Sequence, residues 1–288
     1  MKNKLILFIL LFCSALYAQK PIYVKPKWQK GQQLDLTLTK YYSFKSDSIN
    51  HLYNYKVDIS IKILDITKNG YIAEFYYKNF INNFNNQEFE AEAFLINSIQ
   101  NQKIKVLLSE FGKPIWFYNA NEIDNKLAHR FLELKADSKT EKEGEYGLSL
   151  LAKNNFIESQ LFKALKVYCI STERPVVLNK NNSFFKAHEN ARAKGVVSFK
   201  AFYILKNSIE NANLQDLNFT ITYDKASLEQ VAQNLKFTQP NANVVLAMKG
   251  QNYNLVDVER GIIFKATDSF EIKFEKHTEN IIYEVNLL

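Results

Sequence analysis

The sequence predicts an α+β protein that consists mainly of antiparallel β-sheet, with two central helices and one short later helix. Strand patterns, in which apolar and polar residues alternate with a period of two, dominate both ends of the chain. Between them the apolar residues change to the period of an amphipathic helix. Because strand and helix patterns are segregated along the chain, an α+β architecture is favoured over an α/β architecture.

The clearest strand of the first half runs from Tyr53 to Ile63. Its alternate residues are apolar or aromatic and most residues between them are polar, as in a strand with one face against a core. Asn69-Gly70 follows, and Tyr71–Tyr77 begins a second strand, so a β-hairpin is predicted. The other strands expected in this half are Leu34–Leu38, Glu88–Ala93, Lys103–Ser109 and Pro114–Tyr118.

Two helices are predicted in the middle of the chain. Asn119 can cap the first helix reciprocally with Glu122 at its third position. The second helix is expected over Phe156–Tyr168, and the charged segment Ala136–Tyr146 between the helices is expected to be a surface loop. The residues that form the apolar face of the first helix are Ile123, Leu127, Phe131 and Leu134.

After Pro175 the strand pattern returns. Alternation predicts strands over Val197–Leu205 and Leu217–Tyr223, and a short helix is expected over Lys225–Lys236. The chain is expected to end in a meander of five strands, with tight turns at Glu259-Arg260-Gly261 and Thr267-Asp268-Ser269. These five strands are Val244–Met248, Tyr253–Val258, Ile262–Ala266, Phe270–Phe274 and Ile281–Leu287.

The first eighteen residues have the composition of a secretory signal peptide. Two lysines precede the apolar run Leu5–Phe12, and small residues then lead to a cleavage site between Ala18 and Gln19. The apolar run is shorter than the roughly 20 residues that cross a bilayer as a helix. We therefore expect an exported protein that is periplasmic, outer-membrane-associated or extracellular, with no transmembrane helix after signal removal.

The mature chain is expected to contain a β-rich region over 19–174, which ends in the helical pair, and a β-rich region over 175–288. One continuous domain over 19–288 is the alternative, and the scarcity of glycine and proline, 8 and 5 in all, argues against flexible linkers. After signal removal Cys169 is the only cysteine, so no internal disulfide can form. Folding must therefore depend on an apolar core, for which a hydrophobic fraction of 47% is sufficient.

The motifs of several function classes are missing from the sequence. The formal charge of +7 is scattered among acidic residues and forms no basic stripe, so no nucleic-acid partner is expected. The sequence has no zinc-helix motif, no nucleophile elbow and no glycine-rich phosphate loop. We therefore assign no catalytic, cofactor-binding or metal-binding residue and no cofactor. The histidines, which we interpret as surface or core residues, are His51, His129, His188 and His277.

Two leads towards chemistry remain. Glu88, Glu90 and Glu92 would share one face of a predicted strand, where they could gather a calcium ion or an acid/base pair, although a charged outer strand face is the ordinary alternative. Aromatic residues are more numerous than one strand face needs and could line an apolar ligand site, although core packing explains most of them. They are Tyr41, Tyr42, Phe44, Tyr76, Tyr77, Phe80, Phe84, Trp116, Phe117 and Tyr118.

Four short motifs lie along the chain: Ala18-Gln19, Trp28-x-x-Gly31, Asn69-Gly70-Tyr71 and Gly112…Asn121-Glu122. They resemble motifs of uncharacterised exported β-rich proteins of Bacteroidota. The resemblance implies a location in the cell envelope and no activity. Asp47-Ser48-Ile49 also matches the three-residue O-glycosylation pattern of that group.

The function that these observations favour is non-catalytic binding of an apolar or polymeric ligand by an exported envelope protein. One alternative is a structural or protein-interaction subunit of the envelope, which would offer edge strands to an envelope protein. Another is a hydrolase whose site is assembled from residues distant in the sequence. The sequence favours a protein that is not an enzyme, without excluding the hydrolase.

Overall fold

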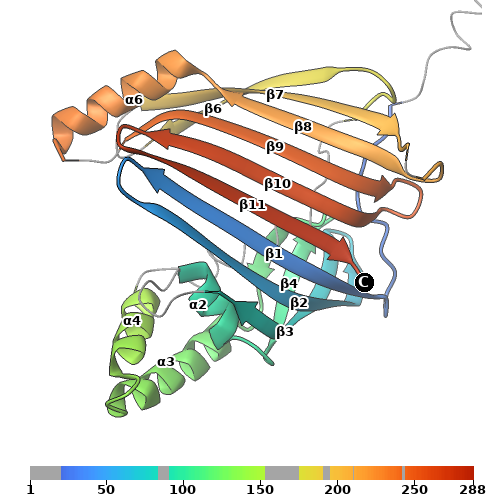
Figure 1. The fold of residues 1–288 in the computed structure, drawn as a ribbon. Helices are drawn as coiled ribbons and strands as arrows, with labels where there is room; N and C mark the ends of the chain where they lie inside the picture. The colour runs from blue at the N-terminus through green and yellow to red at the C-terminus, as the bar shows by residue number, and fades with distance from the viewer. Residues whose placement is uncertain (1–20, 84–90, 153–174, 191–194, 210, 242–243) are drawn as a thin grey trace, which may run out of the picture.

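The fold was obtained as a computed structural model, which describes residues 21–83, 91–152, 175–190, 195–209, 211–241 and 244–288 (Figure 1). The predicted signal peptide with its cleavage site at Ala18 and Gln19, the predicted helix Phe156–Tyr168 and Cys169 lie outside these residues. Within the described part of the chain, no helix has the length and apolar character needed to cross a membrane.

One antiparallel sheet of eleven strands dominates the described chain, as the sequence predicts. Strands that follow one another in the sequence pair with each other, except β5 and β6, which are the two edges of the sheet. Strand β1 also pairs with β11, so both β-rich regions belong to one sheet. In spatial order the strands are β5 (Pro114–Phe117), β4 (Lys103–Ser109), β3 (Gly70–Asn82), β2 (Asn50–Thr67), β1 (Gln33–Ser46), β11 (His277–Leu287), β10 (Ile262–Phe274), β9 (Val245–Asp257), β8 (Gln215–Tyr223), β7 (Gly195–Asn207) and β6 (Asn182–Asn190).

The predicted hairpin between β2 and β3 is confirmed. Thr67 lies opposite Gly70 in the register, and Gly70 has a φ of +136°. A Cβ atom at Gly70 would lie 2.0 Å from the carbonyl oxygen of Leu108 on β4. Glycine is therefore required here both for the turn and for the close approach of the third strand.

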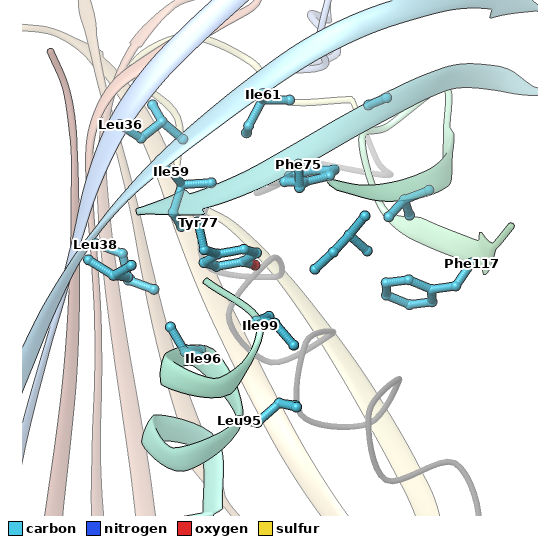
Figure 2. Packing of buried hydrophobic residues seen from close by; sticks show 14 of the residues in the cluster. Leu36, Leu38, Ile59, Ile61, Phe75, Tyr77, Leu95, Ile96, Ile99 and Phe117 are labelled. Carbon is cyan, nitrogen blue, oxygen red and sulfur yellow. The ribbon is translucent and has the colours of Figure 1, made fainter. Parts of the chain in front are cut away.

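The two faces of the sheet differ in polarity. On β2, every second side chain from Tyr55 to Ile63 is buried, and the lysine, aspartate and serine side chains between them lie on the opposite face. Helix α2 (Ala91–Ser98) packs on the apolar face, which we call the inner face, and its Leu95 and Ile96 lie against the strands (Figure 2). Each such buried aliphatic side chain stabilises the fold by about 1.5–3 kcal/mol. This first core includes inner-face residues of β1, β2, β3 and β4.

Helix α3 (Ala120–Ala136) begins where the sequence predicts and buries Ile123, Leu127 and Phe131. The predicted reciprocal capping is wrong, because the Asn119 side chain makes no cap hydrogen bond. Its Oδ1 instead accepts from the backbone N–H of Lys105 at 2.9 Å, and its Nδ2 donates to the carbonyl of Lys103 at 2.8 Å. Asn119 therefore ties the start of the helix to β4.

Helix α4 (Glu141–Leu151) corrects the prediction of a loop over Ala136–Tyr146, because the helix begins at Glu141. Gly144, which lies within the predicted loop, faces α3 across the helix pair. A Cβ atom there would lie 2.3 Å from the backbone nitrogen of Lys135. The glycine therefore serves close helix packing and not a turn.

The predicted later helix is confirmed as α6 (Lys225–Thr238). The Asp224 side chain caps its first turn by accepting from the Ser227 N–H at 2.7 Å. Together α2 and α4 add two helices to the architecture that the sequence predicts, while one of the two expected central helices lies outside the described residues.

The C-terminal meander has three long strands, so the prediction of five short ones is wrong. The turn at Glu259-Arg260-Gly261 is confirmed, since Gly261 has a φ of +65° and donates to the carbonyl of Asp257. The predicted turn at Thr267-Asp268-Ser269 is wrong, because these residues lie in the middle of β10. They pair with β9 on one side and β11 on the other, so ladder hydrogen bonds override the local turn preference.

Candidate functional site

The inner face carries a half-buried apolar surface besides its hydrophobic cores. In the part of the chain that the structure describes, a second core forms where β7, β8 and β9 meet the N-terminal segment, around Val24, Tyr203, Leu205 and Leu217. The half-buried surface belongs to neither this core nor the first one. We call it the apolar patch, and its residues are Tyr42, Tyr53, Ile221, Met248, Phe270 and Ile272.

Strand register makes the apolar patch continuous. Tyr42 lies opposite Tyr53, and the two rings stack with their centroids 4.5 Å apart. Phe270 follows two strands further on, and Ile281 of β11, which also packs against the first core, lies between it and Tyr42. All these side chains point to the inner face, because residues directly opposite one another in a ladder share a face.

Gly250 shapes the middle of the apolar patch. It lies opposite both Phe270 and Ile221 in the sheet. A Cβ atom at Gly250 would be 3.1 Å from Cε1 of the Phe270 ring and 3.5 Å from Cβ of Ile221. The missing side chain therefore lets the Phe270 ring lie close over the β9 backbone, next to Ile221.

An aromatic and histidine cluster forms one end of this surface. The His277 ring lies between Phe44 and Phe274, at centroid distances of 4.5 and 4.3 Å. Its Nε2 is 3.1 Å from Oε1 of Glu279, so the His-x-Glu spacing in the sequence corresponds to a real contact. Among the described residues, no group of three histidine, cysteine or carboxylate side chains could hold a metal ion.

A row of polar residues crosses the inner face beside the apolar patch. The register aligns Tyr55 of β2, Lys40 of β1, Tyr283 of β11, Asp268 of β10 and Asn252 of β9. Each member lies directly opposite the next one, so the row runs across five neighbouring strands. It separates into two groups with different chemistry.

The first group is a closed ion-pair network around Glu92 of α2. The Lys40 ammonium is 2.7 Å from Oε2 of Glu92, and both side chains are almost fully buried. The hydroxyl of Tyr55 donates to Oε1 at 2.9 Å and that of Tyr283 donates to Oε2 at 2.8 Å. The carboxylate is thus neutralised and hydrogen-bonded by three partners, which attach α2 to three strands.

Glu92 also corrects a prediction. The expected strand over Glu88–Ala93 is wrong for its described residues, because α2 begins at Ala91. Glu92 therefore holds Lys40 in the core and takes no part in a carboxylate row on a strand face. Glu88 and Glu90 lie outside the described residues.

The second group is Asp268 and Asn252, which form the carboxyl–amide cluster together with Asn254, the next inner-face residue of β9. Burial raises the pKa of the Asp268 carboxyl to about 6, and a hydrogen bond with the Asn252 side chain lowers it in part. Asn254 is completely buried, and its Nδ2 donates to Oδ1 of Asn252 and to the carbonyl of Leu217. Its Oδ1 has no hydrogen-bond partner among the residues that the structure describes.

The carboxyl–amide cluster was not predicted from the sequence. Asp268 lay in an expected turn, and Asn252 lay between two expected strands. The available signal was Asn252-Tyr253-Asn254-Leu255, in which two amides alternate with apolar residues as they would on one face of a strand.

The predicted aromatic residues separate into three environments. Tyr42 and Phe44 lie on the inner face and Tyr77 and Phe117 lie in the first core. Phe84 lies outside the described residues. The aromatic residues that are exposed away from the inner face are Tyr41, Trp116 and Tyr118.

Comparisons of the chain with known proteins found little similarity. No protein-family model and no curated protein matches the chain. A solved structure on lipid–protein interactions in lipovitellin is similar to it, with a TM-score of 0.47 and 9% identical residues. The similarity covers 91% of this chain and 25% of the lipovitellin chain, so this chain spans about a quarter of that chain's length.

Proposed function

We propose that the protein binds the hydrocarbon chain of an amphiphile on the apolar patch, as a non-catalytic binding protein. The observation that carries this proposal is the run of half-buried aromatic and aliphatic side chains outside the two cores, which Ile281 at the edge of the first core makes continuous. Apolar surface that is still in contact with water gains about 25 cal/mol for each Å² that a ligand covers. Each buried CH₂ group of an acyl chain would contribute about 0.8 kcal/mol.

The shape of the surface favours an elongated ligand. The apolar patch extends from Tyr53 on β2 to Ile221 on β8, across six neighbouring strands. Neighbouring strands are about 4.8 Å apart, so the run of side chains is about 24 Å long. An extended chain of sixteen to eighteen carbon atoms has a comparable length, on the order of 20 Å.

Binding can be tested by displacement of a fluorescent acyl probe from the purified protein. We expect Ile221→Glu to weaken probe binding by about tenfold or more, because it places a charge where hydrocarbon would contact the patch. Ile282→Glu is the matched control, since Ile282 lies on the opposite face of β11, across from Tyr41. Equal effects of the two variants, or no binding of the probe by the parent protein, would exclude the proposal.

We also propose that the protein is exported, on the basis of the predicted signal peptide over residues 1–18. Expression of the full chain in a Gram-negative host, followed by cell fractionation and mass measurement, tests this directly. We expect a mature chain that begins at Gln19 in the periplasmic or membrane fraction. An uncut chain in the cytosol would contradict export and leave the binding proposal intact.

A further inference from the structure

We propose that the carboxyl–amide cluster binds the head group of the ligand, and that this head group is a primary ammonium. The inference rests on the proposed function, since it assigns the polar end of the molecule whose chain covers the apolar patch. It is carried by three neighbouring observations on the inner face: a half-buried carboxyl, two buried or half-buried amides, and one amide oxygen without a partner in the described part of the chain.

The carboxyl–amide cluster adjoins the apolar patch. On β10, Asp268 and Phe270 are alternate residues of one face, and on β9 so are Asn252 and Gly250. A head group beside Asp268 would therefore leave its hydrocarbon chain next to the Phe270 ring. From there the chain can follow the apolar patch along the neighbouring row of inner-face side chains.

The groups that the cluster offers are mainly hydrogen-bond acceptors. An ionised carboxylate accepts and cannot donate, and Oδ1 of Asn254 is a buried acceptor to which no described residue donates. The donors of Asn254 are already directed to Oδ1 of Asn252 and to the carbonyl of Leu217. A ligand that supplies donors would satisfy these acceptors, and an ammonium group supplies three donors and no acceptor.

Charge favours an ammonium over a carboxylate. The charged groups nearest to Asp268 along the polar row are Lys40 and Glu92, which neutralise one another. Tyr283, directly opposite Asp268 on β11, donates its hydroxyl hydrogen bond to Glu92 and not to Asp268. No ion pair of Asp268 occurs among the residues that the structure describes, so a cationic head group would supply the missing counter-charge.

Other ionisable groups on the inner face lie further from Asp268. His277 and Glu279 are at the far end of β11, where Glu279 is opposite Ile272 and not Asp268. The inner-face residues of β9 beside Asp268 are amides and Gly250, which carry no charge. The pH dependence of ammonium binding is therefore expected to follow the Asp268 carboxyl.

The experiment compares dodecylamine, dodecanol and dodecanoate in displacement of the fluorescent acyl probe, below their micelle concentrations. At about pH 7.5 we expect dodecylamine to bind about tenfold more tightly than dodecanol and more tightly still than dodecanoate. Between about pH 7.5 and pH 4.5 the dodecylamine affinity should fall, because protonation removes the Asp268 charge while the amine stays charged.

Asp268→Asn should abolish the preference for the amine and its pH dependence. The affinity of the variant for dodecanol should stay within about twofold of that of the parent protein. Glu271→Gln is the matched control, since it removes one carboxylate from the opposite face of the same strand. Asn254→Leu should weaken amine binding without changing its dependence on pH. Circular dichroism of each variant confirms that the sheet is intact.

The outcomes separate the two proposals. Equal affinities of the three ligands, or a preference for the amine that persists in Asp268→Asn, would refute the assignment of the head group and leave the hydrocarbon site in place. A preference for dodecanol over dodecylamine would assign a neutral head group instead and also refute it. No binding of any of the three ligands would remove the proposed function and this inference together.

Discussion

Replacement of Asp268 by asparagine should stabilise the ligand-free protein at neutral pH. Burial raises the pKa of this carboxyl from 3.8 to about 6 in the folded protein. A difference of about two pH units between the folded and unfolded pKa values corresponds to about 3 kcal/mol when the group is ionised in both states. Asparagine keeps the shape of the side chain and carries no charge, so the variant should avoid this cost.

The direction in which stability changes with pH follows from proton binding. Between about pH 4 and pH 6 the folded protein holds the Asp268 proton while the unfolded chain has released it. The free energy of unfolding contributed by this group therefore falls as the pH rises through this window. Below about pH 4 the carboxyl is protonated in both states, and the difference between parent and variant should vanish.

Urea unfolding of both proteins, followed by circular dichroism from about pH 3.5 to pH 8, tests this dependence. We expect the variant to gain up to about 3 kcal/mol at pH 7.5, or a rise in Tm of about 5–10 °C, and nothing at the acid end. Glu271→Gln, on the exposed side of the same strand, should show a flat difference. A loss of stability in Asp268→Asn, or a gain that is independent of pH, would refute the burial of this carboxyl.

Two further predictions concern the packing of the helices. Glu92→Gln should cost about 3–5 kcal/mol in urea unfolding, because the buried Lys40 ammonium loses its counter-ion. Addition of Lys40→Met should restore most of that loss, and equal stability of the single and double variants would contradict this account. Gly144→Ala should cost about 3 kcal/mol in urea unfolding, because its Cβ would overlap the α3 backbone. Gly31→Ala is the control: a Cβ there would meet no atom within 4 Å, so only its positive φ should cost about 1 kcal/mol, and equal losses would refute close packing of α3 and α4.

Much of the sheet could be predicted because its strands are specified locally. On β2, residues from Tyr53 to Ile63 alternate without interruption, and Asn69-Gly70 fixes the hairpin that follows. Helix α6 was equally predictable, since Asp224 caps it and its apolar residues repeat at helical spacing. The pairing of β1 with β11 was not predictable from local pattern, because it joins segments more than 200 residues apart.

The errors arose where tertiary contacts override local preference. Gly144 reads as a loop residue, but its lack of a side chain allows α4 to lie against α3. Glu92 alternates with apolar residues as it would in a strand, but the buried ammonium of Lys40 draws it into the core from a helix. Thr267, Asp268 and Ser269 favour a turn in isolation, and two neighbouring strands hold them extended.

The two polar groups of the inner face differ in a way that bears on function. Around Glu92 every strong charge has a partner of opposite sign, so the network can fix the position of α2 without a ligand. Around Asp268 a carboxyl lies among amides, and Oδ1 of Asn254 is buried without a hydrogen bond to any described residue, which costs about 1–3 kcal/mol. Apolar residues in the carboxyl–amide cluster would stabilise the sheet at least as well. The carboxyl–amide cluster thus lowers the stability of the inner face, and it lies next to apolar residues outside both cores. We infer that an amphiphilic ligand, with a polar head group and a hydrocarbon chain, explains this combination better than the requirements of folding do.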